Sequence, residues 1–234
     1  MRYENLYRNL LLGGNNIDGE SLGSFDEFIS KNIDKLIVKE VSRFFKKEFL
    51  LFVGPMFGGK TTRMLSELDR HSYRGRDIYV FKPSVDNRYR DSEIVSHNGG
   101  SVAAHVVRNA YEIETLLLKW GVDIAEDSPV IAIDELFMLS GASEVIPRLF
   151  RSGATLIAST IQLNSDGNPF QTIMGLMPYA TKIEVCSAVC SVCSADAFYT
   201  QKMAGRSDFD IEVGGSDLYE PRCFAHFKYF GESL

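Results

Sequence analysis

Residues 50–65 read LLFVGPMFGGKTTRML, and this stretch decides the fold. An apolar, strand-like run leads into a glycine-rich turn, and a helix-like segment follows. Residues 54–61 match the pattern G-x-x-x-x-G-K-[ST] in full, between a strand and a helix as this phosphate-binding motif requires. The stretch therefore predicts a P-loop, in which the backbone amides of the turn and of a helix N-terminus converge on phosphate oxygens.

Individual residues of this turn have separable roles in nucleotide binding. We expect Lys60 to reach the terminal phosphates and the Thr61 hydroxyl to ligate magnesium. The alternative, a tight turn with an exposed lysine, agrees poorly with the intact pattern and its flanks. The predicted nucleotide-binding residues are Gly54, Pro55, Met56, Phe57, Gly58, Gly59, Lys60, Thr61 and Thr62.

Outward from the turn, short apolar runs alternate with helix-like stretches. The apolar runs are residues 49–54, 77–83, 129–135 and 154–160, and the helix-like stretches are residues 62–75, 111–121 and 143–153. Buried apolar strands that alternate with helices indicate a parallel sheet covered on both faces. The predicted fold class is α/β, a P-loop NTPase parallel sheet of the RecA-like type with helices on both faces.

The chain is predicted to divide into three parts. Residues 1–48 form an N-terminal extension with an amphipathic helix, which begins at a capping-box pattern of Ser24 and Glu27. Residues 49–180 form the nucleotide-binding domain, and residues 181–234, where cysteines appear and helical periodicity fades, form the zinc-binding and lasso domain. We expect the N-terminal helix to pack on the main domain or on a partner subunit.

Composition excludes several classes of function. Hydrophobic residues make up 45% and charged residues 24% of the 234 positions, which is typical of a globular protein. The net charge of −6 argues against broad nucleic-acid binding, because phosphate contacts need a basic surface. No apolar run approaches the length of a membrane span, and the N-terminus lacks a signal peptide's apolar stretch. We therefore expect a cytoplasmic protein that binds neither membranes nor nucleic acid.

A second motif, residues 130–135 (VIAIDE), ends an apolar strand in two carboxylates. Asp134 is the predicted partner of hydrated magnesium. Glu135 could orient a water for hydrolysis or accept a proton from a substrate hydroxyl. These alternatives separate an ATPase from a small-molecule kinase, and the motif alone does not choose between them.

All four cysteines lie in the last quarter of the chain. Cys190 and Cys193 form a C-x-x-C pair, and about thirty residues later Cys223 and His226 form a C-x-x-H pair. This spacing predicts a tetrahedral zinc site, which is structural because all four ligands come from the protein. Since such a site is saturated at four ligands, we expect Cys186 to be a buried apolar residue instead.

The segment between the two zinc pairs contains residues 211–219, IEVGGSDLY. Its glycines would let the backbone approach a flat ligand, with Tyr219 as an apolar wall. The alternative is a plain surface turn with a core tyrosine, and the local residues alone favour it.

Together these motifs resemble those of the zinc-containing (type II) thymidine kinases. The similarity covers most of residues 49–230: GPMFGGKTT, KPSVDNRY, IVSHNG, VIAIDE, NPF, AVCSVC with AFYTQK, and IEVGGSDLY ahead of CFAH, in the family's order. The resemblance implies transfer of the γ-phosphate of ATP to the 5′-hydroxyl of thymidine or deoxyuridine, with ATP, Mg²⁺ and structural Zn²⁺ as cofactors. It also implies a cytoplasmic homotetramer in nucleotide salvage for DNA synthesis.

The resemblance assigns roles to individual residues. Glu135 would be the general base, Asp134 and Thr61 would hold magnesium, and Lys60 and Arg88 would steady the transferring phosphoryl group. A zinc-anchored lasso would close over the nucleoside. The implied substrate-binding residues are Met56, Phe137, Met138, Thr200, Ile211, Val213, Gly214, Gly215 and Tyr219.

Departures from the family pattern gather on the nucleoside side. Relatives read D-E-A/G-Q-F where residues 134–138 read DELFM, so Met138 replaces an aromatic residue and Phe137 is expected to take over its position. Residues 160–170, TIQLNSDGNPF, run one residue longer than in relatives and lack a phenylalanine. Two alternatives therefore stay open: a kinase for another deoxynucleoside, and a nucleotide-binding regulatory protein without turnover.

Overall fold

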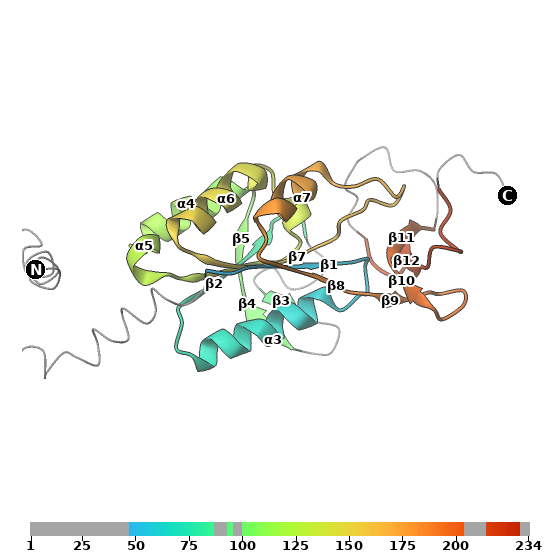
Figure 1. Ribbon diagram of the computed structural model, residues 1–234, viewed down its shortest axis with the longest axis horizontal. Coiled ribbons are helices and arrows are strands. Elements are labelled where there is room, and N and C mark those ends of the chain that lie inside the picture. Colours follow the sequence, from blue (N-terminus) through green and yellow to red (C-terminus); the bar gives the residue numbers. More distant parts are fainter. Residues whose placement is uncertain (1–46, 87–92, 96–99, 204–213, 230–234) are drawn as a thin grey trace, which may run out of the picture. The chain divides into compact units, whose positions relative to one another are not determined.

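Six parallel strands form the central sheet, in the order β5-β2-β6-β7-β1-β8 (Figure 1). The computed structural model describes residues 47–86, 93–95, 100–203 and 214–229. Within these ranges every pairing in the six-stranded sheet is parallel. The strands are β1 Phe49–Val53, β2 Ile78–Pro83, β5 His105–Val107, β6 Val130–Ile133, β7 Thr155–Thr160 and β8 Lys182–Val185.

Helices cover both faces of this sheet (Figure 1). On one side lies α3 (Lys60–Tyr73), and on the other lie α4 (Ala110–Lys119), α6 (Ala142–Ser152) and α7 (Gln171–Leu176). Shorter turns are α5 (Ile124–Asp127), η1 (Leu136–Met138) and η2 (Met177–Tyr179). The predicted fold class, a P-loop type parallel sheet with helices on both faces, is confirmed.

Strand periodicity explains why two apolar cores form. Successive side chains of a strand point to opposite faces, so Leu51 packs toward α4, α6 and α7, whereas Phe52 packs toward α3. Met64 and Leu68 of α3, four residues apart on one face of the helix, complete the second core. The side of the sheet that carries α3 is called the α3 face below.

Besides α3, a small hairpin covers the α3 face. Strand β3 (Glu93–Val95) pairs antiparallel with β4 (Ser101–Ala103). Ile94 is 2% exposed and belongs to the same core cluster as the buried side of α3, and Val102 packs against that cluster. This β3–β4 hairpin was not predicted, because its strands are only three residues long.

Beyond the carboxyl end of β8 the chain forms a small lobe, residues 186–203 and 214–229 of the described chain (Figure 1). It contains two antiparallel pairs, β9 (Ala188–Val189) with β10 (Asp196–Ala197) and β11 (Tyr199–Lys202) with β12 (Tyr219–Arg222). The predicted boundary at residue 181 falls just before β8, which pairs with β1 in the main sheet. We therefore propose that the nucleotide-binding domain extends through Val185.

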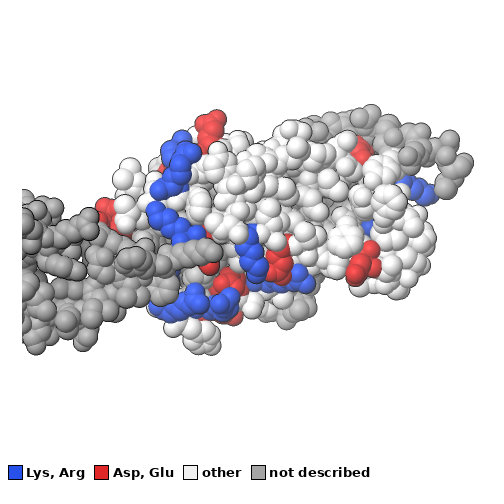
Figure 2. Space-filling view, in the orientation of Figure 1, with Lys and Arg blue, Asp and Glu red and all other residues white. Residues whose placement is uncertain are grey.

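The N-terminal extension, with its predicted amphipathic helix, lies outside the described residues. Among those that are described, the helices are too short or too polar to cross a lipid bilayer. Figure 2 shows acidic and basic side chains side by side on one face of the molecule. Among the ion pairs of the described residues, Arg63 of α3 lies 3.0 Å from Glu184 of β8, and this pair joins the helix to the edge of the sheet.

Candidate active site

The P-loop turn between β1 and α3 depends on glycine at two positions. A Cβ atom at Gly54 would lie 2.2 Å from the carbonyl oxygen of Cys186, so the chain after β8 leaves no room for a side chain there. Gly59 precedes α3 with φ 73°, in the left-handed region that favours glycine. These two residues let the chain turn sharply from the strand into the helix, as the motif predicts.

At the start of α3, Lys60 and Thr61 face the strand ends. The Lys60 side chain is buried, and its Nζ donates a hydrogen bond of 2.7 Å to the Pro55 carbonyl across the turn. The Thr61 hydroxyl donates to the Asp134 carboxylate, at 3.3 Å to Oδ1 and 3.4 Å to Oδ2. The structure thus brings together the P-loop hydroxyl and the carboxylate that the sequence singles out, although 73 residues separate them.

Asp134 lies at the carboxyl end of β6 and is 6% exposed. Burial is the main reason that its pKa rises to about 6, and the neighbouring Glu135 raises it further. The Ser159 hydroxyl of β7 donates a hydrogen bond to Asp134, which opposes the shift, as does the charge of Lys60. A divalent cation bound here would relieve the repulsion between the two carboxylates, and this makes the strand end a fitting site for magnesium.

Glu135 has an unusual backbone conformation, with φ 50° and ψ 47°. The left-handed region costs a residue with a side chain about 1 kcal/mol or more. The conformation turns the chain from β6 into η1 and leaves Glu135 8% exposed, at the wall of the cleft. Such backbone strain at a strand end is frequent at functional sites, where it fixes the direction of a side chain.

A cleft of about 370 Å³ lies in front of these residues. Five parts of the chain form its walls: the P-loop with the start of α3, the end of β2, the end of β6, strand β3, and residues 215–217 of the small lobe. Asp86, in the segment after β2, lines it as well and is 6% exposed. The cleft therefore joins the predicted phosphate-binding turn, both carboxylates and the glycine-bearing segment.

The residues predicted to contact the nucleoside fall into two groups. The Met56 amide donates a 3.0 Å hydrogen bond to the Thr200 hydroxyl, which ties the P-loop to β11 of the small lobe. Tyr219, at the start of β12, is 7% exposed, and its amide donates to the Gly215 carbonyl at 3.0 Å. Met56 and Gly215 line the cleft, while Gly214, next to Gly215, is half-buried.

The second group faces the main core. Phe137 is 8% exposed and packs on Phe170, with ring centroids 4.8 Å apart and ring planes tilted by 44°, and Met138 packs against the same core. Neither lines the cleft that the described residues form. Arg88, Ile211 and Val213 lie outside the described residues, so their predicted roles remain predictions.

Sequence reasoning missed three polar residues near Asp134. Lys82 is the last residue but one of β2, Asp86 lies three residues beyond that strand, and Ser159 lies near the end of β7. Lys82 and Asp86 belong to the motif KPSVDNRY, whose individual residues received no role apart from Arg88. Their position in the sequence could have indicated them, since polar residues at the carboxyl ends of parallel strands meet at one edge of the sheet.

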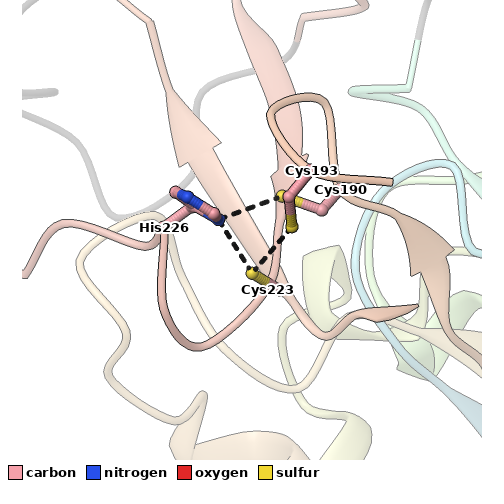
Figure 3. Close-up of side chains that lie close together, drawn as sticks. All are labelled: Cys190, Cys193, Cys223 and His226. Atoms are coloured by element: carbon pink, nitrogen blue, oxygen red, sulfur yellow. Dashed lines mark hydrogen bonds between the residues drawn. The ribbon is translucent and has the colours of Figure 1, made fainter. Parts of the chain in front are cut away.

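In the small lobe, four candidate metal ligands face one another (Figure 3). The Cys193 and Cys223 sulfurs are 3.7 Å apart, and His226 Nδ1 lies 3.2 Å from Cys223 Sγ and 3.9 Å from Cys190 Sγ. Tetrahedral zinc places sulfur and nitrogen ligand atoms about 3.5–3.8 Å apart. The donor set and its spacing therefore fit Zn²⁺.

Two tight turns build this cluster. In one, the Ser194 amide donates to the Cys190 carbonyl at 2.9 Å, and in the other the His226 amide donates to the Cys223 carbonyl at 3.1 Å. Burial opposes ionisation of the Cys190 thiol, but hydrogen bonds from the Cys223, Val192 and Cys193 backbone outweigh it and lower its pKa to about 6. A thiolate near neutral pH suits a cation. Cys186, which is fully buried in the core beside α3, stands apart from the cluster, as expected.

Comparison with known proteins agrees with these motifs. Residues 47–227 match the family model of thymidine kinase. The chain belongs to the thymidine kinase family. The thymidine kinase of Pyrobaculum aerophilum is 34% identical over 184 residues, which cover 76% of this chain and 97% of the relative. That of Thermococcus kodakarensis is 35% identical over 186 residues, 75% of this chain and 91% of the relative.

Among solved structures, the Thermotoga maritima RuvB Holliday junction branch migration motor matches 73% of this chain and 49% of its own. At 18% identity and a TM-score of 0.35 this likeness is too distant to bear on function. Membership of the thymidine kinase family confirms the recognition made from the motifs, and with it an ATP-dependent nucleoside kinase as the enzyme class. A regulatory protein without turnover is not favoured.

Proposed function

We propose that this chain transfers the γ-phosphate of ATP to the 5′-hydroxyl of thymidine or deoxyuridine, with Glu135 as the general base. The observation that carries the proposal is one cleft lined by the P-loop, by Asp134 and Glu135, and by residues 215–217 of the small lobe. Catalysis of phosphoryl transfer consists mainly of positioning and electrostatic stabilisation. A cleft that joins a phosphate-binding turn to buried carboxylates suits both tasks.

On the ATP side, we assign triphosphate binding to residues 54–62, with Lys60 and Arg88 next to the transferring phosphoryl group. Thr61 and Asp134 would hold Mg²⁺, because an oxygen pair at 3.3–3.4 Å in a buried, acidic corner suits a hard cation. When bound, this ion neutralises negative charge on the phosphates. Lys60 supplies further positive charge from a side chain that is already buried and oriented by Pro55.

On the nucleoside side, Glu135 accepts the proton of the 5′-hydroxyl as its oxygen forms a bond to the γ-phosphorus and the bond from that phosphorus to ADP breaks. The strained backbone of Glu135 supports this role, since it limits the directions in which the carboxylate can point. Met56, Thr200 and Tyr219 lie where the P-loop meets the small lobe, and we assign them to nucleoside binding together with Ile211, Val213, Gly214 and Gly215.

Zinc has a structural role in this proposal. Cys190 and Cys193 precede the lasso segment and Cys223 and His226 follow it, so an ion held by all four would fix both ends of the segment. From the family resemblance we further propose a homotetramer that acts in the cytoplasm.

A transfer assay with radiolabelled ATP and a panel of nucleosides tests the function. We expect labelled product with thymidine and deoxyuridine and little with other nucleosides. If only a different deoxynucleoside gave labelled product, the chain would be a kinase for that deoxynucleoside, and the assignment of thymidine and deoxyuridine would be wrong. ATP binding without any labelled nucleoside would overturn the kinase proposal.

A further inference from the structure

Lys82 and Asp134 stand side by side at the carboxyl end of the sheet. Phe81 of β2 pairs with Ile133 of β6, and the Asp134 amide donates to the Phe81 carbonyl at 3.1 Å, so the ladder continues by one residue. Residues at the same level of neighbouring parallel strands point to the same face. That is the α3 face, because Thr61 at the start of α3 donates to Asp134.

The Lys82 side chain is among the most deeply buried of the described residues, with 2% of its surface exposed, although it also contributes to the cleft wall. Its Nζ donates a hydrogen bond of 3.4 Å to the carbonyl oxygen of Glu93, the first residue of β3. A buried ammonium group is costly unless it is hydrogen-bonded. The Lys82 side chain therefore connects the end of β2 to the β3–β4 hairpin.

The β3–β4 hairpin depends on such attachments. Two antiparallel strands of three residues have little stability by themselves. Ile94 and Val102 attach the hairpin to the core on the α3 face, and the contact from Lys82 attaches it beside Asp134. Because Glu93, Ile94 and Val95 form one wall of the cleft, the place of the hairpin sets the width of the cleft at this point.

We propose that Lys82 is a positioning residue, whose buried ammonium group holds the β3–β4 hairpin against the carboxylate end of the sheet and so fixes the cleft wall next to Asp134. For its kinetic consequence this inference rests on the proposed kinase function. The consequence falls on the ATP side, since Lys82 stands beside Asp134, the proposed magnesium ligand, whereas Thr200 and Tyr219 belong to the small lobe.

Amide hydrogen exchange on the full chain tests the structural part. In Lys82→Met we expect exchange of residues 93–95 and 101–103 to rise by about tenfold, the usual scale for losing a hydrogen bond from a charged group. The amides of strands β6 and β7 should exchange at the same rates as in the parent protein. In Lys82→Arg the hairpin amides should also exchange at rates close to those of the parent. The matched control is Lys119→Met, at the exposed end of α4. Unchanged exchange in the hairpin, or an equal rise in β6 and β7, would overturn the proposal.

Kinetics test the functional part. Lys82→Met should raise KM for Mg·ATP by about tenfold and leave KM for thymidine within about twofold, and Lys82→Arg should recover most of the loss. A fall in kcat with both KM values unchanged would mean fewer folded molecules and would refute positioning. If Lys82→Met does not fold, Lys82→Gln takes its place with the same expectations. The exchange experiment does not need turnover, so it tests Lys82 even if the parent phosphorylated no nucleoside.

Discussion

The two ends of the cleft are stabilised in different ways. At the ATP end, the P-loop joins a fully buried strand to a helix whose apolar side packs on the sheet, so the hydrophobic core positions Lys60 and Thr61. At the other end, the small lobe has two short strand pairs and a core cluster of only a few side chains, and its two turns meet at the cysteine-histidine cluster. Burial therefore organises the first end, whereas the second has a much smaller core and four side chains that could hold a metal ion.

The largest effect is expected between the two ends, at Glu135. Glu135→Gln should lower kcat by about two to four decades, the usual scale for losing a general base, while ATP affinity stays nearly unchanged. Steady-state kinetics and ATP titration measure the two quantities. Glu126→Gln, on the exposed turn α5, is the matched control and should retain full activity. Equal turnover in parent and Glu135→Gln would refute the base assignment.

Loss of zinc should separate the two ends most clearly. We expect about one zinc ion per chain in the parent and close to none in Cys193→Ser, because a thiolate ligand is missing. Nucleoside affinity should fall by at least about tenfold, while ATP affinity persists, since the P-loop is built on the main sheet. Metal analysis and titration with each ligand measure this. Cys186→Ala should keep its zinc, because Cys186 lies outside the cluster. Equal loss of both affinities would show that the ends are not independent.

A substitution in the P-loop should affect the ATP end of the cleft and leave the zinc cluster unchanged. Gly54→Ala places a Cβ against the Cys186 carbonyl, and we expect the free energy of unfolding to fall by about 1–3 kcal/mol, with weaker ATP binding and intact zinc. Gly75→Ala is the control: its φ is 66°, but a Cβ there meets nothing within 4 Å, so its cost should stay near about 1 kcal/mol. Urea unfolding measures both variants, and equal losses would show that backbone strain, not the close approach, dominates.

The last prediction concerns the free energy of unfolding that the buried Asp134 carboxylate costs the fold. Because burial raises its pKa to about 6 in the folded chain, the folded state binds a proton more tightly than the unfolded state. Its contribution to stability is therefore largest below about pH 4 and is lost as the pH rises through about 6. Without magnesium, Asp134→Asn should stabilise the fold at pH 7 by about 1–3 kcal/mol and abolish most activity.

Urea unfolding at pH 4 and pH 7 measures this dependence. The gain from Asp134→Asn should shrink at the lower pH, where the parent carboxyl group is protonated. Asp69→Asn, on the exposed side of α3, is the matched control and should change little at either pH. A stabilisation of the same size at both pH values would contradict the electrostatic explanation.

Much of the ATP end could be predicted because its information is local. The turn needs glycine where the chain approaches Cys186 and where φ is positive, and the flanking apolar runs show their strand and helix character within a few residues. The four candidate metal ligands were recognisable for the same reason, since each pair sits in one tight turn. By contrast, β8 and the hairpin strands are too short and too mixed in polarity to be recognised locally.

The residues that contact the nucleoside were harder to predict, because the position of a side chain depends on the residues that pack against it in the tertiary structure. Phe137 packs on Phe170 in the core, since η1 carries it back toward α7, and its contact with the nucleoside stays a prediction. Lys82 was overlooked because a lysine at a strand end usually reaches solvent. In the structure the position lies between β5 and β6, and the Lys82 ammonium group contacts the β3–β4 hairpin, so the side chain is buried.

By itself the sequence determined the alternation of strands and helices, the glycine-rich turn of the P-loop motif, the pair of carboxylates and the four candidate metal ligands, because each is encoded by residues within one turn or one strand. Only the tertiary structure decided which side chains share the cleft. Strand order and register bring together Lys82, Asp134 and Ser159 from three strands far apart in the chain. The physical reason is that neighbours across a parallel sheet are set by the packing of the whole core, which no short stretch of residues encodes.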